Sequence, residues 1–341
     1  MSEAFQFYLT TLLVYLGVDI LACWALNLQL GVAGVINFAI VVFQAIGAYT
    51  TAVLTLGPDT GNGGFQHYVL GAQLPFPVPL VISTGVGALL GLVVGIIGLR
   101  RLRSDYEAMV MLVVSVIATK LVTSDIGLLN GPAGLAVIPQ PLASTLNLAP
   151  LDYSWFYVGI VAVAVALCYV VIRRITNSPY GRMLRAMREN ERAVVALGKN
   201  VASMRLAVFA VGGGIAALSG GLLVGFIGAW SPGSWLYVET FTLFTAIIVG
   251  GMGSNLGAAL GALLVPVVFL EGTRFLPTIG NSDVMAGLQW IVIGLLAMGF
   301  LWFWPRGLVP EKRSPYGHDE HPSQRSLAWL PFQRRANKAG P

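Results

Sequence analysis

The chain has 341 residues, of which 56% are hydrophobic and only 10% are charged, and its formal net charge is +5. A soluble domain usually carries about 25% charged residues, so this composition excludes a soluble enzyme, a disordered protein and a disulfide-based scaffold. The mean hydropathy of +0.77 and the 41 glycines favour a polytopic membrane protein with closely packed helices.

Nine apolar segments are long enough, or nearly so, to cross a bilayer, because a hydrocarbon core of ~30 Å requires about 20 mostly apolar residues. They cover residues 6–28, 33–56, 78–99, 106–123, 152–172, 205–228, 238–252, 255–271 and 284–304. The pattern therefore predicts an all-α transmembrane bundle with about nine spans, in a range of eight to ten. Residues 238–271 form either two short spans or one broken helix.

The positions of the basic residues predict how the spans are oriented. All Lys and Arg residues except Lys120 and Arg274 fall in three clusters, at 100–103, 173–205 and 306–338. We expect all three clusters in the cytoplasm and the segments 57–77, 124–151 and 272–283 outside. The chain then divides into a transmembrane domain at 1–304, which includes a cytoplasmic loop at 173–205, and a cytoplasmic, basic, disordered tail at 305–341.

Polar residues inside apolar spans are functional candidates because they are costly to bury in lipid. Asp19 lies near the middle of the first span, and Asn37 and Gln44 are seven residues apart, so they share a helix face in the second span, with Tyr49 one turn on. These four residues either line a translocation pathway or form interhelical hydrogen bonds that serve packing only. By contrast, Lys120, Glu239 and Glu271 lie near span ends, and we interpret them as interfacial.

Small residues recur at intervals of four in three of the predicted spans, which permits close helix crossings. The glycines in these rows are Gly87, Gly91 and Gly95, then Gly213 and Gly221, then Gly257 and Gly261. The histidines have no ligand cluster around them, so we expect no metal site. We also expect no catalytic residue, no cofactor and no nucleic-acid partner, and the chain contains no phosphate-binding motif for ATP.

The loop at 177–204 predicts one amphipathic helix over 178–198. Ser178 followed by Pro179 is a typical helix start, and Gly198 followed by Lys199 is a typical end. Such a helix either lies on the lipid headgroups or docks into a groove on a soluble partner.

The segment NSPYGRMLRAMRENERAVVALGKNV at 177–201 resembles the cytoplasmic loop of the ABC permeases for branched-chain amino acids, of the LivM and LivH kind. Five further stretches resemble this family in the same order, so that the resemblance covers about residues 20–310. They are GAYTTAVL (47–54), SDYEAMVML (104–112), LNGPAGLAVIP (129–139), VGGMGSNLGAALGA (249–262) and WPRGLVP (304–310). The chain departs from the family pattern at residues 37–43 and at Glu107, where the family usually has an aromatic residue.

The resemblance implies a permease subunit of an ATP-driven importer in the bacterial cytoplasmic membrane, not an enzyme, with a cytoplasmic C-terminus. The implied partners are a homologous permease in a heterodimer, two ATPase subunits and an extracytoplasmic binding protein, besides membrane lipid. In the family this loop carries the coupling helix that contacts the ATPase. The matching residues are Tyr180, Gly181, Arg182, Arg185, Ala186, Arg188, Glu191, Ala193 and Gly198.

The implied cargo is a small amino acid, with leucine, isoleucine and valine first. One alternative is a permease of the same family for urea or short amides. Another, from a different class, is an autonomous secondary transporter or channel, which would need ion-coupling residues or a filter of its own.

Overall fold

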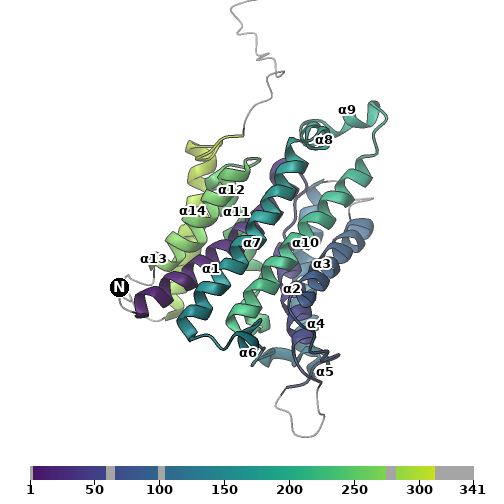
Figure 1. Cartoon of the computed structure of the whole chain (residues 1–341). Coiled ribbons are helices and arrows are strands. Elements are labelled where there is room, and N and C mark those ends of the chain that lie inside the picture. The colour runs from purple at the N-terminus through teal and green to yellow at the C-terminus, as the bar shows by residue number, and fades with distance from the viewer. Residues whose placement is uncertain (1–2, 59–65, 99–103, 274–281, 312–341) are drawn as a thin grey trace, which may run out of the picture. The chain divides into compact units, whose positions relative to one another are not determined.

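Each of the nine apolar segments contributes a helix in the computed structural model (Figure 1), which describes residues 3–58, 66–98, 104–273 and 282–311. Among the residues that the structure describes, seven helices are long and apolar enough to cross a membrane, and two apolar helices, at Ile40–Thr55 and Gly287–Phe303, are shorter. Within the described ranges, β structure is limited to two isolated bridges. The predicted all-α polytopic bundle is confirmed. The basic cluster at 100–103, Arg274 and the tail beyond Glu311 lie outside the described residues.

The main helices are α1 (Glu3–Leu26), α2 (Ile40–Thr55), α3 (Val78–Gly98), α4 (Ser104–Ser124), α7 (Pro150–Asn177), α10 (Val201–Ile227), α11 (Tyr237–Gly250), α12 (Asn255–Ala262) and α14 (Ser282–Phe303). Two of them continue as π-helix, α1 through η1 (Asn27–Val32), and α12 through η4 (Leu263–Leu270) into α13 (Glu271–Thr273). The short elements are α5 (Ile126–Leu129), η2 (Gly131–Ala133), α6 (Ala143–Leu146), α8 (Pro179–Glu189), α9 (Glu191–Ala196) and η3 (Pro232–Ser234).

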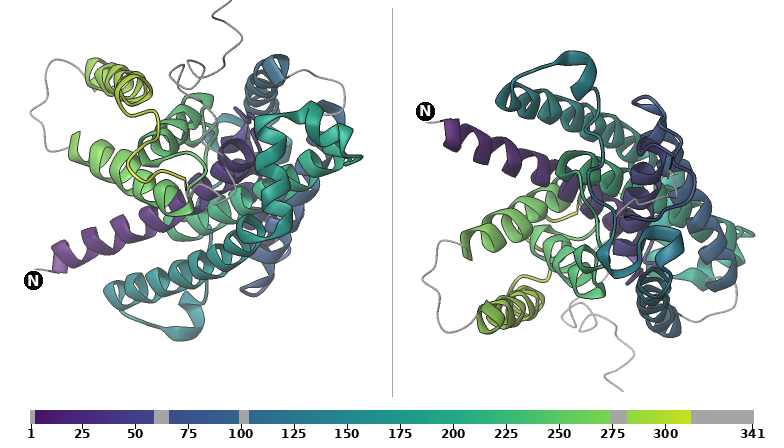
Figure 2. Two further views of the ribbon diagram at one scale, coloured as in Figure 1. Left: turned by 90° about the horizontal axis from the view of Figure 1, so that it is seen from above. Right: turned by 90° about the horizontal axis from the view of Figure 1, so that it is seen from below.

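Helix α10 forms the interior of the bundle and packs against α1, α2 and α3, whereas α14 lies at the periphery (Figure 2). Small residues permit these close crossings. A β-carbon at Gly91 would lie 2.6 Å from the Phe209 carbonyl oxygen, and one at Gly213 would lie 2.7 Å from the Gly87 carbonyl oxygen. The predicted glycine rows therefore face neighbouring helices, and Gly95 is also buried on α3.

Helices α11 and α12 form an antiparallel pair joined by a tight turn. A β-carbon at Gly257 would lie 2.6 Å from the Gly250 carbonyl oxygen, and Gly261 abuts the Ala246 backbone. The turn contains Gly251 at φ +121°, a conformation that side chains rarely adopt. Residues 238–271 are therefore two helices rather than one broken helix.

The second helix begins later than the apolar pattern predicts, at Ile40 rather than residue 33. Gly34 has φ +73°, and the Asn37 side-chain oxygen accepts a 2.8 Å hydrogen bond from the Ala39 amide, which closes a local turn. The predicted helix face shared by Asn37 and Gln44 is consequently wrong, because Asn37 precedes the helix.

Different segments of the chain gather at the two ends of the bundle. At one end, here called the arginine end, residues 31–34, 176–199, 251–255 and 306–311 gather, as the contacts between Arg188 and both Gly31 and Glu311 show. At the opposite end, bridges join Tyr68 to Leu129 and Leu135 to Trp230. The second basic cluster therefore shares an end with Arg306, the one member of the third cluster that the structure describes, and 124–151 lies at the other end (Figure 1).

Candidate functional site

The loop after α7 contains two helices, not the single helix predicted over 178–198. The Ser178 hydroxyl caps α8 by accepting a 3.3 Å hydrogen bond from the Gly181 amide. Asn190 then adopts an extended conformation (φ −153°, ψ 93°), and its side chain caps α9 by accepting from the Ala193 amide at 3.1 Å. Asparagine is a strong cap and a poor interior helix residue, which explains the break. Gly198, at φ +72°, follows the end of α9.

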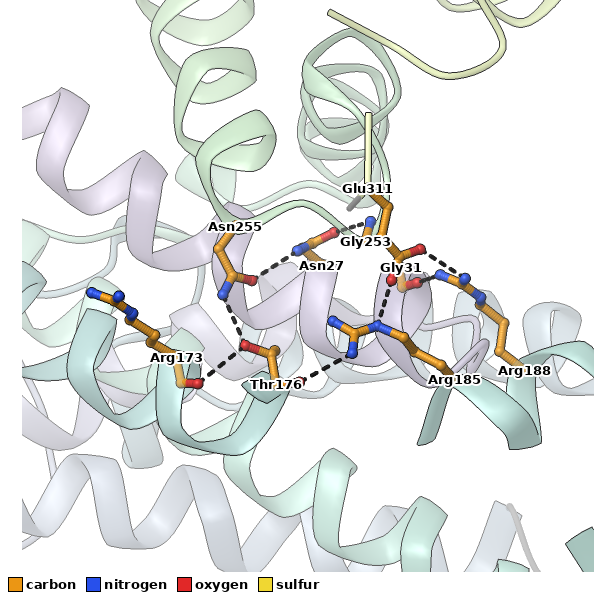
Figure 3. A network of polar contacts seen from close by, with 9 residues as sticks. All are labelled: Asn27, Gly31, Arg173, Thr176, Arg185, Arg188, Gly253, Asn255 and Glu311. Carbon is orange, nitrogen blue, oxygen red and sulfur yellow. Dashed lines mark hydrogen bonds and ion pairs between the residues drawn. The ribbon is translucent and has the colours of Figure 1, made fainter. Parts of the chain in front are cut away.

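Two arginines of α8 bind one carboxylate at the start of the C-terminal tail (Figure 3). Arg185 Nε donates to Glu311 Oε1 at 2.5 Å, and Arg188 Nη2 donates to Glu311 Oε2 at 2.8 Å. Arg185 also donates to the Thr176 carbonyl at 3.1 Å, and Arg188 donates to the Gly31 carbonyl. Charge-assisted hydrogen bonds of this kind are roughly twice as strong as neutral ones, so they hold α8 against α7, η1 and the tail.

The same contacts extend to the turn between α11 and α12. Asn27 accepts a 2.8 Å hydrogen bond from the Gly253 amide and donates to Asn255 Oδ1 at 3.4 Å, while Asn255 donates to the Thr176 hydroxyl at 3.1 Å. This set is called the loop network below. Its members are Asn27, Gly31, Thr176, Arg185, Arg188, Gly253, Asn255 and Glu311 (Figure 3).

The beginning of the tail is held in place by backbone hydrogen bonds as well. The Leu308 amide donates to the Val249 carbonyl and the Val309 amide to the Gly250 carbonyl, both at 2.9 Å. Residues 305–311, which composition alone assigns to the tail, therefore pack on the end of α11, and this places Glu311 beneath α8.

A second anchor joins α9 to the bundle. Arg205 of α10 pairs with Glu191 of α9 at 2.7 Å and lies 3.8 Å from Glu107 of α4. Arg205 is 8% exposed and Glu107 is 1% exposed. Glu107, which departs from the family pattern, thus has a structural partner, and Glu191 is engaged within its own chain.

Some of the remaining coupling candidates contact the bundle, and the others are exposed on the surface of the loop. The Tyr180 hydroxyl donates to the Met204 carbonyl at 3.3 Å, and a β-carbon at Gly181 would collide with the Thr176 carbonyl. The small size of Gly181 therefore permits the close approach of α8 to the end of α7. Arg182 and Ala186 are exposed.

The outward surface of the loop combines small, apolar and basic side chains. Ala193 and Arg192 are exposed on α9, and the nearby Val195 and Leu197 are 56% and 77% exposed. A hollow at the junction of α8 and α9 is lined by Glu189 to Arg192 and by Val195. Together with Arg182 and Ala186, these residues form the loop surface.

A cavity of ≈ 380 Å³ lies inside the bundle, between α1, α2, α10, α11, η4 and α14. The structure brings two of the four pathway candidates to it, Asp19 and Gln44, and Gln44 also donates to the Ser219 hydroxyl at 3.0 Å. The other two lie elsewhere. Asn37 donates to Gln29 Oε1 at 2.9 Å, and Tyr49 packs edge-on against Trp235 with ring centroids 6.2 Å apart. Glu239, which is exposed in the first turn of α11, and Glu271, at the start of α13, also line this cavity.

A bundle of long apolar helices with a cavity among them and a helical loop anchored at one end is the architecture of a multi-pass membrane protein. A family model described as the permease component of the branched-chain amino acid transport system matches residues 8–301. The chain belongs to this family, so the resemblance to the LivM and LivH permeases is confirmed.

Curated relatives agree with this assignment. The probable branched-chain amino acid transport permease protein LivM of Methanocaldococcus jannaschii is 27% identical over 328 residues, which cover 89% of this chain and 94% of the relative. The high-affinity branched-chain amino acid permease LivM of Escherichia coli is 29% identical over 84% of this chain and 67% of its own length. The fructose import permease FrcC of Rhizobium meliloti is 26% identical over 73% and 70%. No solved structure matches the chain.

Proposed function

We propose that this chain is the transmembrane permease subunit of an ATP-driven importer for small zwitterionic amino acids, with leucine, isoleucine and valine as the preferred cargo. Membership of the family and the names of the two LivM relatives support this cargo. In this proposal the chain itself performs no covalent chemistry. A homologous permease completes the pathway in a heterodimer, two ATPase subunits bind and hydrolyse ATP, and an extracytoplasmic binding protein delivers the cargo.

We further propose that the arginine end lies in the cytoplasm of a bacterial cell, where the loop faces the ATPase, and that the C-terminus is also cytoplasmic. The distribution of Lys and Arg supports this orientation, because the three segments predicted outside, 57–77, 124–151 and 272–283, contain a single Lys or Arg residue, Arg274.

The single observation that carries the proposal is the loop network. Arg185 and Arg188 tie α8 to η1, α7 and the segment after α14, so a displacement of α8 would act on several spans at once. Arg182, Ala186 and Ala193 remain exposed and are free to meet a partner. We assign ATPase contact to these outward residues and transmission of the motion to the two inward arginines.

The test is transport by the purified complex in proteoliposomes. The chain is coexpressed with its neighbouring transport genes, and uptake of labelled leucine is measured with ATP inside or outside, with an ATPase variant that binds but does not hydrolyse ATP as the control. Uptake that requires ATP hydrolysis on the side of the loop is the expected result. Uptake of fructose or urea instead of leucine would contradict the cargo, and uptake driven by an ion gradient without ATP would contradict the importer.

A further inference from the structure

The cavity inside the bundle is acidic. Asp19, Glu239 and Glu271 line it, and none of the residues that the structure shows in its wall is Lys, Arg or His. No hydrogen bond or ion pair joins the Asp19 carboxylate to another described residue, and Glu239 is close enough to repel it electrostatically. Asp19 is partly buried and Glu239 is exposed. Two carboxylates that line one cavity favour a cation between them, because a nearby opposite charge stabilises their ionised forms.

Buried polar groups in the same wall also have no partner. The Thr242 hydroxyl lies one helical turn from Glu239 and is 3% exposed, and the Trp230 indole is 4% exposed. Neither Thr242 Oγ1 nor Trp230 Nε1 has a hydrogen-bond partner among the described residues. Because buried polar side chains are normally satisfied, these two atoms independently indicate that the cavity takes a polar ligand.

The shape of the cavity suits an organic cation better than a bare metal ion. Its volume of ≈ 380 Å³ falls within the usual range for small-molecule sites, about 300–1,000 Å³. Trp230, Trp235 and Trp290 contribute aromatic faces, and Val18 and Leu243 contribute aliphatic ones. Aromatic faces attract ammonium groups, and aliphatic walls suit an apolar side chain.

The cavity lies toward the end opposite the loop network. Trp230, which lines it, is bridged to Leu135 at that end, and Asp19 lies near the middle of the continuous helix of α1 and η1, whose η1 end reaches the arginine end. Under the proposed function, this is the end from which a binding protein delivers cargo.

We propose that Asp19 and Glu239 form a subsite that binds the ammonium group of the cargo within this cavity. The assignment rests on the proposed function only in naming the source of the ammonium group as an amino acid. Thr242 and Trp230 supply further polar contacts, and the aromatic and aliphatic walls hold the side chain of the cargo.

The test is binding of small probes to the full chain in nanodiscs of neutral lipid, followed by saturation-transfer difference NMR. The probes are leucinamide, which has the ammonium group but no carboxylate, and 4-methylpentanoate, which has the carboxylate but no ammonium group. We expect leucine and leucinamide to bind and 4-methylpentanoate to bind at least about tenfold more weakly, as the loss of a charge-assisted contact implies. Empty nanodiscs give the background.

The variants separate the subsite from general folding. Asp19→Asn and Glu239→Gln are expected to weaken leucinamide binding by roughly tenfold, whereas Asp19→Glu retains it. Glu3→Gln, a change at an exposed carboxylate at the start of α1, is the matched control and leaves binding unchanged. Equal binding of 4-methylpentanoate and leucinamide, or unchanged binding by both neutral variants, overturns the subsite. Displacement of leucinamide by Na⁺ but not by choline at equal ionic strength also overturns it, because the site would then hold an inorganic cation.

Failure of the ammonium subsite can be distinguished from failure of the proposed function. If the wild-type complex shows no ATP-driven uptake while leucinamide binding still depends on Asp19, the function is wrong and the subsite stands. If ATP-driven leucine uptake proceeds normally and binding does not depend on Asp19 or Glu239, the subsite is wrong and the function stands.

Discussion

Replacing Glu311 by glutamine isolates the central contact of the loop network. The substitution keeps the size of the side chain but removes its charge. It leaves one neutral oxygen for Arg185 and Arg188 together and presents an NH₂ group to a second donor. Because Glu311 lies outside the apolar helices, the packing of the spans should be unaffected, and any effect should be confined to the attachment of α8.

The free energy lost from the attachment of α8 follows from the exposure of the three side chains. Glu311 is 21% exposed, and Arg185 and Arg188 are 30% and 27% exposed. Fully exposed ion pairs contribute only about 0.2–1 kcal/mol, whereas each hydrogen bond to a charged group contributes about 1.5–3 kcal/mol when it is protected from water. Two such bonds at this intermediate exposure give about 2 kcal/mol. At 1.4 kcal/mol for each factor of ten, local opening of α8 should increase roughly 30-fold.

Hydrogen exchange measured by mass spectrometry tests this number, because exchange through local opening reports the local free energy. Peptides from 179–189 should exchange roughly 30-fold faster in Glu311→Gln, while those from α10 keep their rates. Glu189→Gln is the matched control, since Glu189 is exposed on the same helix. An increase below about threefold in α8, or an equal increase in α10, would refute the reasoning. A double-mutant cycle with Arg188→Met should give a coupling of at least about 1 kcal/mol.

Three further predictions concern the loop, the topology and the packing. Ala186→Glu should abolish copurification of the ATPase and leave the melting temperature unchanged, and normal assembly with normal uptake would instead favour the loop as a membrane-surface anchor. In intact cells an impermeant maleimide should label Gln140→Cys but not Glu189→Cys; the reverse pattern would invert the topology, and the two native cysteines are buried. Gly91→Val should lower the free energy of unfolding by about 1–3 kcal/mol through overpacking, as followed by thermal unfolding in detergent. Gly159→Ala, where nothing lies within 4 Å of the added carbon, should have no such cost.

The apolar spans could be located from sequence to within a few residues because their length and composition are fixed by the thickness of the bilayer. The helix boundaries that were predicted wrongly are those at which the hydropathy of the sequence does not change. Residues 34–39 are nearly as apolar as the helix that follows, and only Gly34 and Asn37 signal that the chain is not yet helical. The break at Asn190 was similarly hidden, because the residues on both sides of it favour helix.

The loop network could not be predicted from the sequence, for a different reason. Glu311 is separated from Arg185 and Arg188 by more than a hundred residues, and it precedes a stretch whose composition is that of a solvated tail. The cavity could be predicted from the sequence only in part. Asp19 attracts notice because it is a charge near mid-span, but Glu239 lies close to the start of its helix and reads as interfacial. Only the packing of α1 against α11 places both on one cavity.

Two helices connect the cavity to the loop network, and this makes a final prediction possible. Helix α1 carries Asp19 in the cavity and continues through η1 to Gly31, while α11 carries Glu239 and ends at the backbone that binds the tail. If the network transmits motion and the cavity binds cargo, the two functions should separate. Glu311→Gln should lower ATP-driven uptake and leave leucinamide binding unchanged, whereas Asp19→Asn should weaken binding and leave exchange in α8 unchanged. A loss of leucinamide binding in Glu311→Gln would mean that the network also shapes the cavity, through the continuous helix of α1 and η1.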